Sequence, residues 1–394
     1  MLALALVSGV SPFATDTYIA ALPAVQDDLG TTASAAQLTM TAFLLGFAAG
    51  QLVCGPVSDA TGRRRILIAF STTFAVLSLV CGAAPNAALL ITARALQGFA
   101  GGCGLAVGRA VISDRYTGGD AAVRFGALAS IMLLAPVVAP AIGGVILLVG
   151  DWRTIFLFLA GLGVVMTTAV VIGIPETLPV DARSSAGLAE TVRRMNGLLH
   201  QRPFMGAVLV QCLAMAGFFT YIGGSSFVLQ EEMGLSESEY SLLFVSNAAA
   251  MAAVSVGFTT SVRRVGLIRW RAIGLAASTA ATGALAAYAI AVDEVQLAPV
   301  WVLLGITVAG MGASIPASIA IAQELGRSVG GTASALQGGL SFAIGAAATP
   351  LTGVTGQTSM AGMSLLMACL FVCSAAVLLA TRAPAWAPRL SPAG

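Results

Sequence analysis

The chain has very little charge, no lysine and one histidine, His200. Asp, Glu and Arg make up 9% of its 394 residues, against about 25% in a typical soluble domain. A soluble globule needs charged side chains over much of its surface, so this composition excludes that class. Apolar residue types make up 58% of the chain, which excludes a disordered protein as well.

Long apolar runs are what the sequence has instead. Runs of about 20 residues are typical of helices that span a membrane, whereas a membrane barrel needs alternating strands of about ten. The sequence therefore predicts an all-α membrane protein. Polar breaks separate twelve candidate spans, near 2–22, 38–57, 66–84, 88–112, 124–148, 154–174, 204–229, 238–261, 272–291, 298–322, 331–355 and 361–380.

The cysteines give no sign of a metal or redox site. All six fall inside apolar runs: Cys54, Cys81, Cys103, Cys212, Cys369 and Cys373. No C-x-x-C pair occurs, and His200 lies in a polar segment away from them. We interpret the six as buried thiols that act as small hydrophobic side chains, and we expect neither a metal nor a cofactor.

Arginine is distributed unevenly between the two sides of the membrane. With the N-terminus taken as cytoplasmic, 16 of 19 Arg fall in inside segments, Arg153 falls outside, and Arg94 and Arg109 lie within a span. The outside loops carry acidic residues instead, namely Asp27, Asp28, Asp151, Glu231, Glu232, Glu237, Glu239, Asp293 and Glu294. Cytoplasmic loops hold the excess of basic residues. We therefore predict that both termini are cytoplasmic, in a bacterial inner membrane given the heavy use of Ala, Gly and Arg.

The longest polar stretch, 175–203, divides the chain into two parts with six spans each. The predicted organisation is an N-terminal half over 1–174, a cytoplasmic linker over 175–203, and a C-terminal half with a short tail over 204–394. Within the linker, 188–199 fits a short amphipathic helix on the cytoplasmic face. Two six-helix pseudo-repeats joined in this way are typical of transporters built from parallel repeats.

Two ionisable residues lie well inside predicted spans, where a charge costs at least about 2.5–3.5 kcal/mol. Asp16 in the first span and Arg94 in the fourth both lie about six residues, or roughly 9 Å, from the outer face. An acid and a base at equal depth can pair across a central cavity. One interpretation is a static salt bridge that helps the bundle fold. The other is a carboxylate whose proton affinity Arg94 controls.

A few further polar and aromatic residues lie at depth. Arg109 lies near the inner end of its span, where it can reach the headgroups or pair with Asp114, or else serve a gate or substrate path. Gln211 is a polar residue within a span, and its side chain either joins two helices by hydrogen bonds or contacts a ligand. The aromatic residues can line an apolar pocket, face lipid or lie in an interfacial belt. Candidate cavity-lining residues are Phe13, Tyr18, Gln97, Phe219, Tyr221 and Asn247.

The loop between the second and third spans carries a recognisable motif, Gly55-Pro-Val-Ser-Asp59-Ala-Thr-Gly62-Arg63-Arg64-Arg65. We expect Gly55 to permit close helix contact, Asp59 to end the second helix, and Gly62 to make a tight turn. The motif resembles the G-x-x-x-D-R/K-x-G-R-R/K loop of the major facilitator superfamily. Ala60 stands where that family has a basic residue, so the charge network of the loop is expected to be weaker or rearranged.

Three further stretches resemble motifs of particular groups within this superfamily. Arg94-Ala-Leu-Gln97-Gly98 is similar to the R-x-x-Q-G motif, whose Arg is linked to proton transfer. The fifth span, with the motif residues Pro136, Pro140, Gly143 and Gly144, is similar to the Gly-Pro-rich antiporter motif. The first span, from Ser11 to Pro23, resembles twelve-helix drug:proton antiporters, closest to the Bcr/CflA group of chloramphenicol- and bicyclomycin-type exporters. There the matching Asp is linked to coupling of proton and substrate.

The resemblance implies a monomeric exporter of small, mostly apolar drugs that exchanges them for protons. Asp16 is then the coupling carboxylate beside Arg94, the partners are drug, proton and lipid bilayer, and the proton gradient supplies the energy. A proton symporter or uniporter for a small nutrient on the same fold is the alternative. An intramembrane enzyme needs a nucleophile and base or a metal site at depth. The candidate spans offer one deep carboxylate and no His, so we expect no enzyme.

Overall fold

The computed structural model describes residues 2–116, 138–179, 183, 188–292, 294–326, 330–353 and 359–381. In these residues nine helices are long and apolar enough to cross a membrane. A shorter apolar helix, Val138–Val149, lies in the fifth predicted span. The predicted all-α membrane fold is confirmed.

The N-terminal half is a bundle in which α3 (Ala33–Thr61) packs along α5 (Ala87–Arg115). Helix α4 (Arg63–Gly82) contacts α5 and α7 (Trp152–Gly173), and α1 (Leu2–Asp16) contacts α5 and α7. The first predicted span is not one continuous helix. After α1 come the short 3₁₀ turn η1 (Ile19–Ala21) and α2 (Leu22–Asp28), so the chain breaks directly after Asp16.

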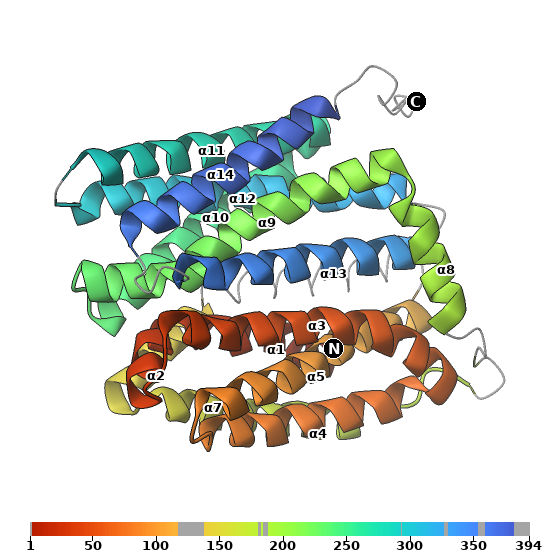
Figure 1. Cartoon of the computed structure of the whole chain (residues 1–394). Helices are drawn as coiled ribbons and strands as arrows, with labels where there is room; N and C mark the ends of the chain where they lie inside the picture. The colour runs from red at the N-terminus through yellow and green to blue at the C-terminus, as the bar shows by residue number, and fades with distance from the viewer. Residues whose placement is uncertain are drawn as a thin grey trace.

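The C-terminal half has a matching arrangement. Helix α9 (Arg202–Phe227) continues into a π-helical turn, η3 (Val228–Glu232), and packs against α13 (Gly330–Ala348) and α14 (Met360–Ala380). Helix α12 (Leu297–Leu325) contacts α10 (Glu237–Val265) and α11 (Leu267–Ala291), and η5 (Thr349–Gly353) follows α13. The two bundles lie beside each other in Figure 1, with α3 and α13 facing across the boundary.

The two ends of the bundle differ in charge. One end, at the right of Figure 1, has the α3–α4 and α10–α11 joints and is called the basic end because Arg63, Arg64, Arg263 and Arg264 lie there. The other end has α2 and η3 and is called the acidic end. In the linker, α8 (Leu188–Leu199) is a helix at the basic end, as its amphipathic pattern predicted.

The α3–α4 and α10–α11 joints have the same local form, which reveals the internal repeat. Gly62 separates α3 from α4 with φ +101°, and Gly266 separates α10 from α11 with φ +88°. Residues with side chains rarely adopt positive φ, so glycine is required at both joints. The tight turn predicted at Gly62 is present. Gly55 is different, because a Cβ built there meets nothing within 4 Å. The expected close helix contact at Gly55 is wrong.

The close contact lies earlier in α3, where a stripe of glycines faces α5. A Cβ added to Gly46 or Gly50 would clash with α5 backbone, and one added to Gly98 or Gly102 would clash with α3 backbone. These four glycines let the two backbones touch, as small residues do in membrane helix pairs.

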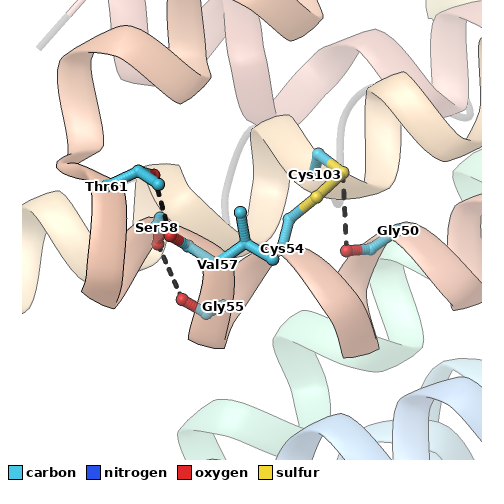
Figure 2. The surroundings of a disulfide bond; sticks show 7 residues. All are labelled: Gly50, Cys54, Gly55, Val57, Ser58, Thr61 and Cys103. Atoms are coloured by element: carbon cyan, nitrogen blue, oxygen red, sulfur yellow. Dashed lines mark hydrogen bonds between the residues drawn. A yellow bond between two sulfur atoms is a disulfide. The ribbon is translucent and has the colours of Figure 1, made fainter. Parts of the chain in front are cut away.

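The interpretation of all six cysteines as free thiols is wrong. Cys54 and Cys103 form a disulfide between α3 and α5, with their Cα atoms 5.0 Å apart. Figure 2 shows this bond, with the carbonyl of Gly50 beside Cys103. The physical reason is the glycine stripe, which brings the two backbones within bridging distance just where the cysteines follow it. A spacing of 49 residues in different helices carries no such signal. The other four cysteines are free thiols. Cys81 and Cys212 are buried as expected, whereas Cys369 and Cys373 are exposed, so their expected burial is wrong.

Candidate functional site

A cavity of about 380 Å³ lies between the two halves, a size that holds one small organic molecule. Residues of α1, α3 and α5 form one wall, and residues of α9, α10, α12 and α13 form the other. Most of the lining is apolar. Phe218, Tyr221 and Phe244 stack in sequence, with ring centroids 6.2 and 5.7 Å apart. The cavity is therefore an aromatic site with few polar groups.

Asp16 is the acid in the lining of this cavity. It is the last residue of α1, and its side chain is buried, with Thr15 Oγ1 donating to Oδ1 at 2.9 Å. The Thr15 hydroxyl also lies 3.1 Å from the carbonyl of Ser11, so a single hydroxyl serves several acceptors. The carboxyl group thus faces an apolar space at a break in the first membrane span.

Arg94 is fully buried inside the N-terminal half. Its Nη1 donates to Gln97 Oε1 at 2.9 Å. Three aromatic rings surround the guanidinium carbon, with centroids at 4.4 Å for Phe43, 5.0 Å for Tyr18 and 5.6 Å for Phe156. Cation–π contacts of this kind stabilise a desolvated cation. The structure thus holds the Arg94 charge in an aromatic cage.

The expected ion pair between Asp16 and Arg94 is not formed in this structure. The ion pairs in the described residues are Arg63–Asp59, Arg63–Asp114 and Arg153–Asp28. Asp16 faces the cavity between the halves, whereas Arg94 points into the N-terminal bundle. Equal depth in the sequence does not fix how each helix is rotated about its axis, and the two side chains leave α1 and α5 in different directions.

The other residues expected in the cavity wall divide into two groups. Phe219 and Tyr221 line the cavity. Phe13, Tyr18, Gln97 and Asn247 lie elsewhere: Phe13 packs against the core, and Tyr18 contributes to the Arg94 cage. Gln97 donates to Ser78 Oγ at 2.7 Å, and Asn247 donates to the Tyr221 hydroxyl at 3.2 Å. Asn247 therefore positions a cavity residue without lining the cavity itself.

Several polar residues of the cavity were missed by the sequence analysis. Gln51 of α3 and Gln337 of α13 both line it, together with Gln211 and Arg109. Their position within apolar spans was the available signal, and it was used only for Gln211 and Arg109. Asp114, one of the alternatives for Arg109, accepts at Oδ2 from Arg63 at 3.0 Å and from Thr177 at 3.1 Å, while Arg109 itself lines the cavity.

Hydrogen bonds across the boundary close the acidic end. Gln37 Nε2 in α3 donates to the carbonyl of Gly223 at 3.1 Å and to Thr352 Oγ1 at 2.9 Å. Thr41 donates to the carbonyl of Ala346 at 2.8 Å. Two more bonds of this kind join Ser34 to Pro350 and Gln230 to Ala20. The two halves are thus held together at the acidic end in this conformation.

At the basic end, Arg63 organises the loop motif. It binds Asp59 and Asp114 together, so α3, α4 and α5 are tied at one guanidinium despite the alanine at position 60. Glu176 caps α4 by accepting from the backbone N–H groups of Arg63 and Arg64 at 2.9 and 3.3 Å. Partial burial raises the pKa of the Glu176 carboxyl, but backbone donors outweigh this and the net pKa lies below its ordinary value. The first residues of the linker are therefore fastened to the N-terminal half.

The motif of the fifth span falls partly outside the described residues. Pro136 lies outside them, whereas Pro140, Gly143 and Gly144 belong to the helix Val138–Val149. A Cβ on Gly143 would clash with the backbone of Thr17, and one on Gly144 would lie 2.9 Å from Ser241 of α10. This helix thus touches both the chain break after Asp16 and the opposite half.

Comparison with known proteins decides the family. The sequence profile of the Major Facilitator Superfamily matches residues 4–350. The chain belongs to the Major Facilitator Superfamily. It is 34% identical over 366 residues to the uncharacterized MFS-type transporter YdgK of Bacillus subtilis, covering 91% of this chain and 90% of that one. The superfamily and these relatives make the protein a multi-pass membrane transporter rather than an enzyme.

Two further comparisons give one more distant relative and one protein of similar fold. The chain is 26% identical to the multidrug resistance protein MdtL of Escherichia coli over 80% of its own length and 78% of MdtL. The crystal structure of the D-xylose-proton symporter matches with a TM-score of 0.74 at 14% identity, over 96% of both chains. That structural match shows the fold alone.

Proposed function

We propose that this transporter exports small, mostly apolar aromatic drugs in exchange for protons, and that it belongs to the Bcr/CflA-like drug:proton antiporters. The observation that carries the proposal is the position of Asp16, a buried carboxyl group in the wall of a mostly apolar cavity between the two halves. The similarity to MdtL supports a drug as the substrate.

The orientation follows from charge. The basic end faces the cytoplasm of a bacterial inner membrane, and both termini lie on that side. The conformation held together at the acidic end by Gln37 and Thr41 is then the inward-facing one. The halves 1–174 and 204–394 move as units about the cavity, joined by the linker 175–203.

Drug and proton are exchanged because both bind in the same apolar cavity. With the cavity open outward, Asp16 takes a proton, which lets the neutral carboxyl stay in the aromatic environment. Opening inward admits water, releases the proton and allows drug to enter. The transporter then returns to the outward-open conformation with drug bound, which completes the cycle. Asp16 and Arg94 both belong to the N-terminal half, so Arg94 acts on Asp16 only if α1 and α5 rearrange within that half; in this conformation its charge lies in the aromatic cage.

Proton symport or uniport of a small nutrient is the second candidate, and the similarity of fold to a sugar–proton symporter favours it. A sugar site needs several convergent hydrogen-bonding groups. The cavity has Gln51, Gln211 and Gln337, but Phe, Leu, Ile and Met dominate its wall. The drug proposal fits this lining better.

The proposal is tested with the full-length protein in liposomes that have an acidic lumen. Wild type should accumulate chloramphenicol while the pH gradient lasts and release it when the gradient is dissipated. Asp16→Asn should lose this accumulation. Asp27→Asn, which removes an exposed carboxylate at the acidic end, is the matched control and should accumulate drug as wild type does. Equal accumulation by Asp16→Asn and wild type would show that Asp16 does not carry the proton.

A further inference from the structure

Two glutamines in the cavity have amide nitrogens without a partner. Nε2 of Gln51 and Nε2 of Gln337 are both buried and have no hydrogen-bond partner among the described residues, and both residues line the cavity. The Gln337 side chain is almost fully buried at 2% exposed. Buried N–H groups in proteins are nearly always paired, so two orphans in one cavity indicate a missing acceptor.

The two amides belong to opposite halves and to neighbouring parts of the cavity wall. A Cβ on Gly339 of α13 would lie 3.2 Å from the side chain of Leu52 of α3, and Phe47 meets Phe342 edge-on at 5.5 Å. These contacts align the two helices in opposite directions. They place the residue before Leu52 beside the turn of α13 that contains position 337. One ligand group can therefore reach an amide from each half.

The surroundings define what such a ligand is. Phe47 and Phe342 flank the amides, and Phe219 packs on Phe342 with ring centroids 5.9 Å apart. Aromatic faces favour a planar ring. Arg109 lines the same cavity and its charge disfavours a cation beside it, while the one acid of the wall is Asp16 at the end of α1. The site thus fits an uncharged aromatic molecule that carries a hydrogen-bond acceptor.

We propose that Gln51 and Gln337 form a subsite that binds a carbonyl or nitro group of an uncharged aromatic substrate from both halves at once. This inference rests on the proposed export function and names its substrate class. Held by one amide from each side, the substrate draws α3 and α13 together. Binding therefore stabilises the closed cavity before the halves move, which an apolar molecule without an acceptor does not achieve.

The test is binding to the purified full-length protein, measured by equilibrium dialysis with two radiolabelled probes. Chloramphenicol is uncharged and aromatic and carries nitro and amide oxygens. Tetraphenylphosphonium is an aromatic cation without any hydrogen-bonding group. Gln51→Leu and Gln337→Leu should each weaken chloramphenicol binding about tenfold, the loss expected for one buried hydrogen bond. Each should leave any tetraphenylphosphonium binding within about twofold of wild type.

A matched control is Gln323→Leu, which removes a half-buried amide of α12 outside the cavity lining and should bind chloramphenicol as wild type does. Unchanged chloramphenicol binding in both cavity variants would overturn the subsite. Wild type that binds only the cation, or neither probe, would overturn the substrate class. Gln-dependent binding of chloramphenicol without gradient-driven accumulation in liposomes would support the subsite and refute the export function instead.

Discussion

At the scale of single residues, Arg94 is a buried guanidinium in the membrane that has no carboxylate partner among the described residues. Three aromatic rings and the amide of Gln97 stabilise it. The planar guanidinium suits this cage, because it can lie against ring faces while its edge donates hydrogen bonds. A lysine ammonium is a compact charge that is more strongly hydrated than a guanidinium, so burying it costs more.

Arg94→Lys keeps the positive charge but replaces the planar guanidinium with an ammonium group. We expect this substitution to lower the free energy of unfolding by about 2 kcal/mol, the upper range for desolvated cation–π contacts. Thermal unfolding of the purified protein in detergent measures the change. Arg269→Lys is the control, because Arg269 is exposed at the basic end and should melt as wild type does. If both variants melt at the wild-type temperature, the aromatic cage does not stabilise the fold.

The positions of the buried ionisable residues were also predicted well from the sequence. Asp16 and Arg94 stand out because ionisable side chains within apolar spans are costly and rare. What they touch was beyond prediction. The direction of a side chain depends on the rotation of its helix. For Asp16 it also depends on the chain break after α1, which the apolar run 2–22 conceals.

At the scale of helices, the glycine stripe between α3 and α5 sets the tightest contact of the N-terminal half. Gly98→Ala would place a methyl group against the backbone of Phe43. We expect a loss of about 2–3 kcal/mol, because neither backbone can move without breaking its neighbours' contacts. Gly161→Ala is the control, since a Cβ there meets nothing within 4 Å.

Fluorescence-detected size-exclusion chromatography after heating compares the two alanine variants. Gly98→Ala should lose its monodisperse peak at a temperature several degrees below wild type, while Gly161→Ala should match or slightly exceed wild type. Equal stability of the two variants would mean that α3 and α5 do not touch as closely as the structure has them.

The disulfide between α3 and α5 predicts how many cysteines can be labelled before and after reduction. Unfolded in denaturant with a maleimide and no reductant, the protein should take up four labels, at Cys81, Cys212, Cys369 and Cys373. After reduction it should take up six, because Cys54 and Cys103 are released. Intact-protein mass spectrometry counts the labels. Six labels without reductant would contradict the disulfide.

At the scale of the whole molecule, low charge and long apolar runs predicted the all-helical membrane fold. The predicted division into six and six spans also rests on a compositional signal, the polar linker. The cavity could not be predicted in the same way. It is formed where α3 packs on α13 and η1 packs on α9 and α10, and these contacts join residues about 300 positions apart in the case of Thr41 and Ala346. Helices that are apolar on nearly all sides give no pattern from which such pairings follow.

The central claim is that drug and proton move in opposite directions through this cavity. The direct measurement uses liposomes that contain the full-length protein and a pH-sensitive dye, with equal pH on both sides, to which chloramphenicol is added outside. Antiport predicts that drug entry drives protons out, so the lumen becomes alkaline with wild type and stays unchanged with Asp16→Asn. A lumen that turns acidic would show symport, and a constant pH during drug entry with wild type would show uniport; either result contradicts the account.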